Sequence, residues 1–99
     1  MKNETRQVRL VRCTSKGEWD FAKKLRMTCF FEPLSIQDPY TWTFDHKEHV
    51  HFIFYQEDTM VGYAHIQLWA NHRAALRIIA IDEQYRNHGL GSQFLHLCE

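Results

Sequence analysis

The sequence predicts an α+β domain with the element order β-α-(α)-β-β-β-α and an antiparallel meander at its centre. Three observations predict this class. A short alternating strand precedes an amphipathic helical segment, three strand-like runs then follow one another across short polar turns, and a glycine-bearing loop leads into a last amphipathic segment. Residues 1–99 are expected to form a single domain, because no internal repeat or low-complexity tract divides them.

The N-terminal third predicts a strand followed by a helix. Alternation over residues 8–12 indicates the strand. Ser15 and Glu18, three positions apart, fit a capping box, so a helix is expected from Glu18 to Phe30, with Pro33 soon after its end. The positions expected on its buried face are Phe21, Ala22, Leu25, Thr28 and Cys29, whereas Lys23, Lys24 and Arg26 are expected to face away.

The middle of the chain predicts an irregular connection and a sheet. Residues 31–45 contain both prolines and several aromatic residues, which fit a structured connection with a turn of helix. Strands are expected at 49–56, 60–69 and 74–81, with polar turns between them. Gly62 and Ala64 in the second of these strands would permit close approach on one face.

Composition narrows the function classes. Twelve basic and twelve acidic side chains leave no net charge, which argues against broad attraction to nucleic acid or to an acidic membrane. No apolar run approaches the roughly 20 residues that a membrane span needs, and the N-terminus lacks the apolar core of a signal peptide. Three widely spaced cysteines are typical of reduced thiols, so a cytoplasmic location is expected.

Seven histidines raise the question of a metal site. His49 and His51 share a strand face, with His46 close in sequence, but zinc sites usually add a third ligand and supporting groups. A solvated edge face explains the pair more simply, and no metal is expected.

The segment from Arg86 to Ser92 has the features of a phosphate site. It follows a predicted strand and opens a predicted helix, where backbone N–H groups lack intrahelical partners and attract phosphate oxygens. Gly89 and Gly91 would let a phosphate lie against the backbone, and Arg86 can add a charge-assisted contact. The pattern fits neither a dinucleotide fingerprint, which needs three glycines, nor a P-loop, which needs Gly-Lys-Ser/Thr.

This loop resembles the acyl-CoA pyrophosphate loop of the GNAT superfamily of N-acetyltransferases, Arg/Gln-x-x-Gly-x-Gly/Ala. Residues 76–86 resemble that family's fourth strand and the start of its loop, although Glu83 stands where the family often has proline. The resemblance implies acetyl-CoA as co-substrate, an amine acceptor, and transfer by direct attack of the amine on the thioester. The cofactor-binding residues that it implies are Ile79, Ala80, Ile81, Arg86, Asn87, His88, Gly89, Leu90, Gly91 and Ser92.

The resemblance leaves the catalytic residues open. Ala75 stands where family members often have a glutamate base, and the usual tyrosine acid would lie beyond Glu99. His72 and His65 are the candidate bases, since neutral imidazole can accept a proton near pH 7, with water as the alternative. The family binds its acceptor beside the connection, so its aromatic residues (Phe31, Tyr40, Trp42 and Phe44) could line an acceptor pocket or simply pack as core.

The chain is short for this family, and the predicted last helix has no C-terminal cap, so the domain is expected to be C-terminally incomplete. Three functions therefore remain: an acetyltransferase, a non-catalytic acyl-CoA-binding or regulatory module, and an inactive truncated relative. Without a fifth strand, residues 76–81 would form an exposed sheet edge. Such an edge favours pairing with another chain, so a homo-oligomer such as a dimer is expected.

Overall fold

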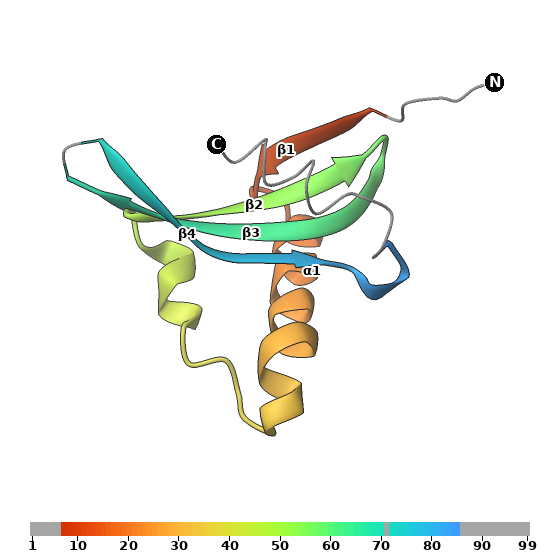
Figure 1. Ribbon diagram of the computed structural model, residues 1–99, viewed down its shortest axis with the longest axis horizontal. Coiled ribbons are helices and arrows are strands. Elements are labelled where there is room, and N and C mark those ends of the chain that lie inside the picture. The colour runs from red at the N-terminus through yellow and green to blue at the C-terminus, as the bar shows by residue number, and fades with distance from the viewer. Residues whose placement is uncertain (1–6, 71, 86–99) are drawn as a thin grey trace.

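The computed structural model describes residues 7–70 and 72–85, and these form one antiparallel sheet with a helix against it (Figure 1). The strands are β1 (Val8–Arg12), β2 (His49–Gln56), β3 (Thr59–Trp69) and β4 (Arg73–Ile81). Their spatial order is β1-β2-β3-β4, and each neighbouring pair is antiparallel. The α+β class and the central meander are therefore confirmed, whereas the predicted helix after the loop lies outside the described residues.

The helix α1 (Lys16–Arg26) begins at the predicted capping box. The Ser15 side chain accepts a hydrogen bond from the Glu18 N–H, and the Glu18 carboxylate accepts from the backbone of Thr14 and Ser15. These bonds lower the pKa of Glu18 to about 2, with a further contribution from the Tyr55 hydroxyl. The last predicted turn differs, because Met27–Phe31 forms a π-helical turn and Glu32–Leu34 a 3₁₀ turn.

The connection returns to the sheet through a second 3₁₀ turn at Thr41–Asp45, which confirms the predicted turn of helix. This turn lies on the same side of the sheet as α1 (Figure 1). We call that side the α1 face. Among the described helices, none is long and apolar enough to cross a membrane.

The two faces of the sheet carry different cores. On the α1 face, Ala22 and Leu25 of the helix pack on Ile53, Tyr63 and Ala80 of the strands. The opposite face carries an apolar cluster built on Phe54, Val61 and Ala64. Strand alternation explains most of the division, because successive side chains point to opposite sides of a sheet. Val61 is the exception: it is the extra residue where the β2–β3 register shifts.

Two irregularities shape β3 and β4. The register shifts between Phe54 and Tyr55 against β3, and again between His65 and Ile66 against β4. In the second shift His65 pairs with Ile78 and Ile66 pairs with Leu76, so Arg77 is the extra residue of a β-bulge.

Gly62 allows its neighbours within the sheet to approach β3 closely, whereas the sequence predicted an approach on one face of the strand. An added Cβ would lie 2.9 Å from the Ala80 carbonyl oxygen and 2.9 Å from the Phe54 ring.

Three predictions about individual side chains were wrong. Arg26 does not face away from the core but is fully buried, and Thr28 is exposed instead of buried. His49 and His51 do not lie on a solvated edge, because β2 is an interior strand and His51 is only 2% exposed. Interior strands leave no solvated edge, and hydrogen bonds to neighbouring side chains and to the backbone allow these polar groups to be buried.

Candidate functional site

A buried ion pair anchors the polar part of the α1 face. Arg26 Nε donates to Asp38 Oδ2 at 2.5 Å, and Arg26 Nη2 donates to Asp38 Oδ1 at 3.1 Å. Their side chains are 0% and 6% exposed. Burial opposes both charges, yet the bidentate pairing holds the pKa of Asp38 below and that of Arg26 above its ordinary value. Because Asp38 belongs to the connection, this pair ties the connection to α1.

The remaining Arg26 nitrogen faces two strand residues. Nη1 donates to the Tyr63 hydroxyl at 2.9 Å and contacts His65 Nδ1 at 3.4 Å. A guanidinium can only donate, so both of these atoms accept. As an acceptor at Nδ1, neutral His65 carries its hydrogen on Nε2, and the Tyr63 hydroxyl keeps its own hydrogen to donate.

One short chain of hydrogen bonds continues from Tyr63 and a second from His65. Tyr63 Oη donates to His51 Nδ1 at 2.6 Å, which leaves His51 Nε2 to donate to the Thr43 carbonyl at 3.1 Å. In the second chain, His65 Nε2 donates to His49 Nδ1 at 2.8 Å. The rings of His51 and His65 stack with centroids 4.4 Å apart. The network therefore satisfies Arg26 and both buried imidazoles.

Both buried histidines are neutral at neutral pH. Burial, followed by neighbouring positive charges, lowers the pKa of His65 to about 3, and burial lowers that of His51 to about 4. Burial likewise raises the pKa of Tyr63. These groups therefore act as hydrogen-bonding dipoles rather than charges.

A cavity of about 390 Å³ opens beside this network. We call it the polar cavity. It lies between the sheet and the connection, and its described lining is Arg26, Tyr40, Trp42, Thr43, His49, His65, Gln67, Arg77 and Ile78. Its size is in the range of small-molecule sites, and it combines aromatic walls with a few polar groups.

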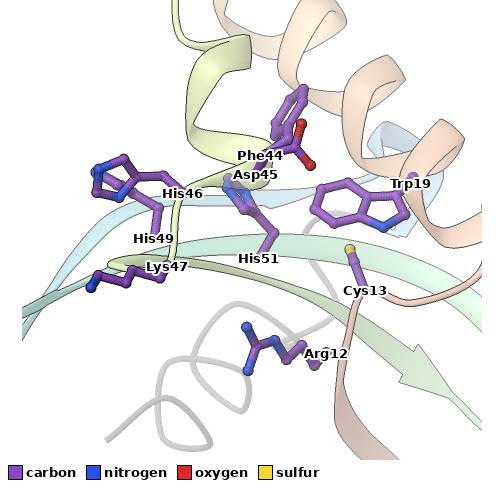
Figure 2. Close-up of a pocket in the computed structure, with 9 residues that line it drawn as sticks. All are labelled: Arg12, Cys13, Trp19, Phe44, Asp45, His46, Lys47, His49 and His51. Carbon is purple, nitrogen blue, oxygen red and sulfur yellow. The ribbon is translucent and has the colours of Figure 1, made fainter.

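A second hollow of about 230 Å³ lies beside the 3₁₀ turn, with Phe44 and Asp45 of that turn in its lining (Figure 2). Trp19, Phe44 and His51 stand around it, with ring centroids 5.0 to 5.5 Å apart. Burial and then Glu18 raise the pKa of Cys13, which also lines it, to about 12. Such a thiol is protonated at neutral pH and is therefore a poor nucleophile.

A third hollow, of about 320 Å³, borders β4 and is lined by Cys29, Phe30 and residues 79–81. We call it the outer hollow. The Asp82 N–H donates to the Val61 carbonyl, and this bond fixes the hydrogen-bonding alternation along the β3–β4 pair. The N–H and C=O of Ala80 face Tyr63 on β3, whereas those of Ile79 are directed away from β3. An extended amide chain could therefore pair with Ile79.

The structure places the two candidate bases far apart. His65 is 5% exposed in the middle of β3 and lines the polar cavity. His72 is exposed in the turn before β4, has a φ of 59°, and is not among the described residues of that cavity. The remaining predicted residues, 86–92, lie outside the described part of the chain.

Sequence reasoning missed Arg26, Asp38 and Tyr63 as site residues. One signal was present, because Arg26 lies four positions after Ala22 and so shares its buried face. Within residues 7–70 and 72–85, no group of three or more metal-binding side chains is arranged to hold an ion.

Three solved structures share the fold. A transcriptional regulator from Bacillus halodurans C-125 superimposes with a TM-score of 0.67 at 12% identity, covering 91% of this chain and 70% of its own. An aminoglycoside acetyltransferase, meta-AAC0020 from an uncultured soil metagenomic sample, was solved in complex with trehalose. It gives a TM-score of 0.66 at 15% identity over 92% of this chain and 66% of its own. A putative acetyltransferase of the GNAT family from Desulfovibrio desulfuricans gives a TM-score of 0.63 at 18% identity, over 91% and 62%.

This chain thus spans 62 to 70% of the length of those three structures. A comparison with curated proteins returns no match. The model of the acetyltransferase (GNAT) family matches residues 19–99, which include most of α1, the connection, strands β2 to β4 and the predicted loop. The chain therefore belongs to the GNAT acetyltransferase family.

Proposed function

We propose that this chain transfers an acetyl group from acetyl-CoA to an amine that binds in the polar cavity. One observation carries the proposal: consecutive residues of β4 line the polar cavity and the outer hollow. Ile78 lines the polar cavity, and Ile79 and Ala80 line the outer hollow. An amine on one side and a thioester on the other would therefore come together at this point of the strand.

The outer hollow suits the pantetheine arm of acetyl-CoA, which carries two amide groups. Its lining of Cys29, Phe30 and residues 79–81 supplies apolar contact, and the N–H and C=O of Ile79 can bond an amide of the arm as a neighbouring strand would. The pyrophosphate would rest on Arg86 to Ser92, a role that the sequence motif supports.

The reaction would be a direct displacement. The lone pair of the neutral amine attacks the acetyl carbon, the C–S bond then breaks, the nitrogen loses a proton, and the thiolate of CoA gains one. A proton acceptor is therefore needed near the polar cavity.

We propose water as that acceptor, in preference to His65 or His72. Arg26 occupies His65 Nδ1, and a pKa of about 3 makes this imidazole a weak base at neutral pH. His72 lies outside the described lining of the cavity. His65 would then hold the His49 ring in position through their hydrogen bond instead of taking the proton.

The test is acetyl transfer by the purified chain, followed by release of free CoA thiol and by mass spectrometry of the acceptor. Ile79→Pro removes the N–H proposed to bond the arm, and Gly91→Val places a side chain where the motif needs none. We expect both to weaken acetyl-CoA binding in calorimetry by at least about tenfold. Full affinity and activity in both variants would refute this cofactor site.

A binding module without catalysis is the second candidate. It is favoured by the described cavity lining, which contains no carboxylate to serve as a base. This candidate predicts that acetyl-CoA binds to the chain but that no amine in a broad panel is acetylated.

We also propose that the chain self-associates through β4. Among the described strands, β4 pairs with β3 alone, and Leu76 on it is 39% exposed. Sedimentation velocity should show a dimer. A monomer at high micromolar concentration would contradict this proposal.

A further inference from the structure

We propose that the polar cavity selects an acceptor amine that also carries a carboxylate beside an apolar or aromatic group, as an α-amino acid does. This inference rests on the proposed acetyl transfer and names the substrate class of the same site. Three properties of the cavity carry it: the absence of acidic side chains from its described lining, the position of Arg77, and two exposed aromatic rings.

The described lining offers no carboxylate to pair with the charges of a polycation. It contains two arginines and two histidines but no carboxylate. Asp38 is the acidic group behind Arg26, and its oxygens already accept hydrogen bonds from Arg26 and from the Tyr40 N–H. A polyamine or an aminoglycoside would bring several positive charges to a wall that already carries Arg77, and like charges repel.

Arg77 is the charge in this cavity that has no acidic partner among the described residues. Regular alternation would place its side chain on the sheet face opposite to that of Ile78, yet both residues line the cavity. The β-bulge at this position explains why, because an extra residue redirects the side chain. The guanidinium lies near His49 and His65, and it adds to the effect of burial in lowering the pKa of each. A planar guanidinium favours a bidentate carboxylate.

The aromatic rings supply the apolar side of the site. Tyr40 and Trp42 are 50% and 56% exposed at the cavity. Trp42 is held edge-on against His46 and His49, with ring centroids 5.6 and 5.2 Å apart. Exposed rings with fixed orientation are typical of a surface that packs on a ligand.

The test compares two ligands that differ only in the carboxylate. N-acetyl-L-tryptophan and N-acetyltryptamine share the indole and the acetamide, which are the product features of the proposed reaction. Calorimetry on the full chain should give at least about tenfold tighter binding of N-acetyl-L-tryptophan, the factor expected for one charge-assisted contact. Equal affinity, or binding of neither ligand, would overturn the inference.

Variants then assign the preference to Arg77. Arg77→Gln should remove most of the difference between the two ligands, Arg77→Lys should keep part of it, and Arg77→Glu should reverse it. Arg73→Gln is the matched control, because Arg73 is exposed on the same strand but is not among the described residues of the cavity. A preference that survives in Arg77→Gln would overturn the assignment.

Turnover separates this inference from the proposed function. With acetyl-CoA present, L-tryptophan should be acetylated in preference to tryptamine, spermidine and kanamycin. Transfer to the polycations instead would refute the proposed substrate class but would support the proposed acetyl transfer. Carboxylate-selective binding without transfer to any amine would sink the proposed function and leave the ligand preference intact.

Discussion

The two faces of the central sheet are built on opposite principles. The α1 face buries Arg26, His51, Tyr63 and His65 in one hydrogen-bonded network, whereas the opposite face carries the apolar cluster of Phe54, Val61 and Ala64. Apolar packing tolerates small shifts of partners, but a buried polar group loses its compensation as soon as one partner is removed. The α1 face, which also holds an apolar core, should therefore be sensitive to single charges and to pH as well as to volume, whereas the apolar cluster of the opposite face should be sensitive to volume. It is also the α1 face that borders the polar cavity.

The largest effect is expected from breaking the buried ion pair. Asp38→Ala leaves the fully buried Arg26 without its counter-charge and should cost about 3–5 kcal/mol of unfolding free energy. Urea denaturation would measure it. Replacing both partners, as Arg26→Met with Asp38→Leu, should recover part of the loss: no uncompensated charge remains, but Tyr63 Oη and His65 Nδ1 lose the Arg26 donor. A loss in the double variant as large as in Asp38→Ala would contradict this account.

Acid should destabilise the α1 face through its histidines. The folded pKa values of His51 and His65, about 4 and about 3, lie below the unfolded value of about 6.5. The unfolded chain therefore binds more protons in this window, and stability falls as pH drops below about 6.5. Lowering the pH from 6.5 to 5 should cost about 2 kcal/mol for each histidine.

The matched variant for this effect is His65→Gln, which cannot gain a proton in this range. Denaturation from pH 7 to pH 5 should show a shallower loss of stability than in the wild type. An unchanged slope would mean that His65 does not stay neutral in the folded chain.

Volume should dominate on the opposite face. Gly62→Ala places a Cβ 2.9 Å from the Ala80 carbonyl and from the Phe54 ring, and the backbone of β4 cannot move away without losing its pairing. We expect a loss of about 1–3 kcal/mol that does not depend on pH. Gly17→Ala is the control, because its Cβ meets nothing within 4 Å and should be neutral or slightly stabilising. Equal stability of the two variants would show that the strands tolerate a wider spacing.

The smallest effect is expected at the exposed pair of Lys16 and Asp20. Their 2.7 Å contact is almost as short as the 2.5 Å contact between Arg26 Nε and Asp38 Oδ2, yet both side chains are largely exposed to solvent. Water screens such a pair, so Lys16→Ala should leave the denaturation midpoint unchanged within error. A loss comparable to that of Asp38→Ala would show that contact distance matters more than burial.

Sequence periodicity predicted the strands well and the polar interior poorly. The expected strands at 49–56, 60–69 and 74–81 agree with β2, β3 and β4 to within one residue, because alternation is a local property. Arg26 was placed outside because charged side chains are rarely buried unless they are paired. Its partner Asp38 lies 12 residues away, across a connection whose path no local pattern specifies.

Of the candidate site too, the sequence predicted one part and missed another. His65 was singled out by residue type, and the structure places it at the polar cavity. Arg77 was not singled out, because its position depends on a bulge that appears only when β3 and β4 are paired. Local sequence carries propensities, whereas register between strands is a property of the assembled sheet.

Arg26 never releases its proton at any pH at which the protein is folded, so the polarity of both imidazole chains is permanent. In this arrangement each ring holds its hydrogen on Nε2, because the opposite tautomer would turn the His65 Nδ1 hydrogen toward the Arg26 guanidinium or leave the Tyr63 hydroxyl without an acceptor. Nitrogen-15 spectra of the side chains of His51 and His65 should show the chemical shifts of the tautomer with hydrogen on Nε2 for both rings. The hydrogen-bond dipoles on this face of the sheet therefore keep one orientation, and they can align a reactant that binds beside them.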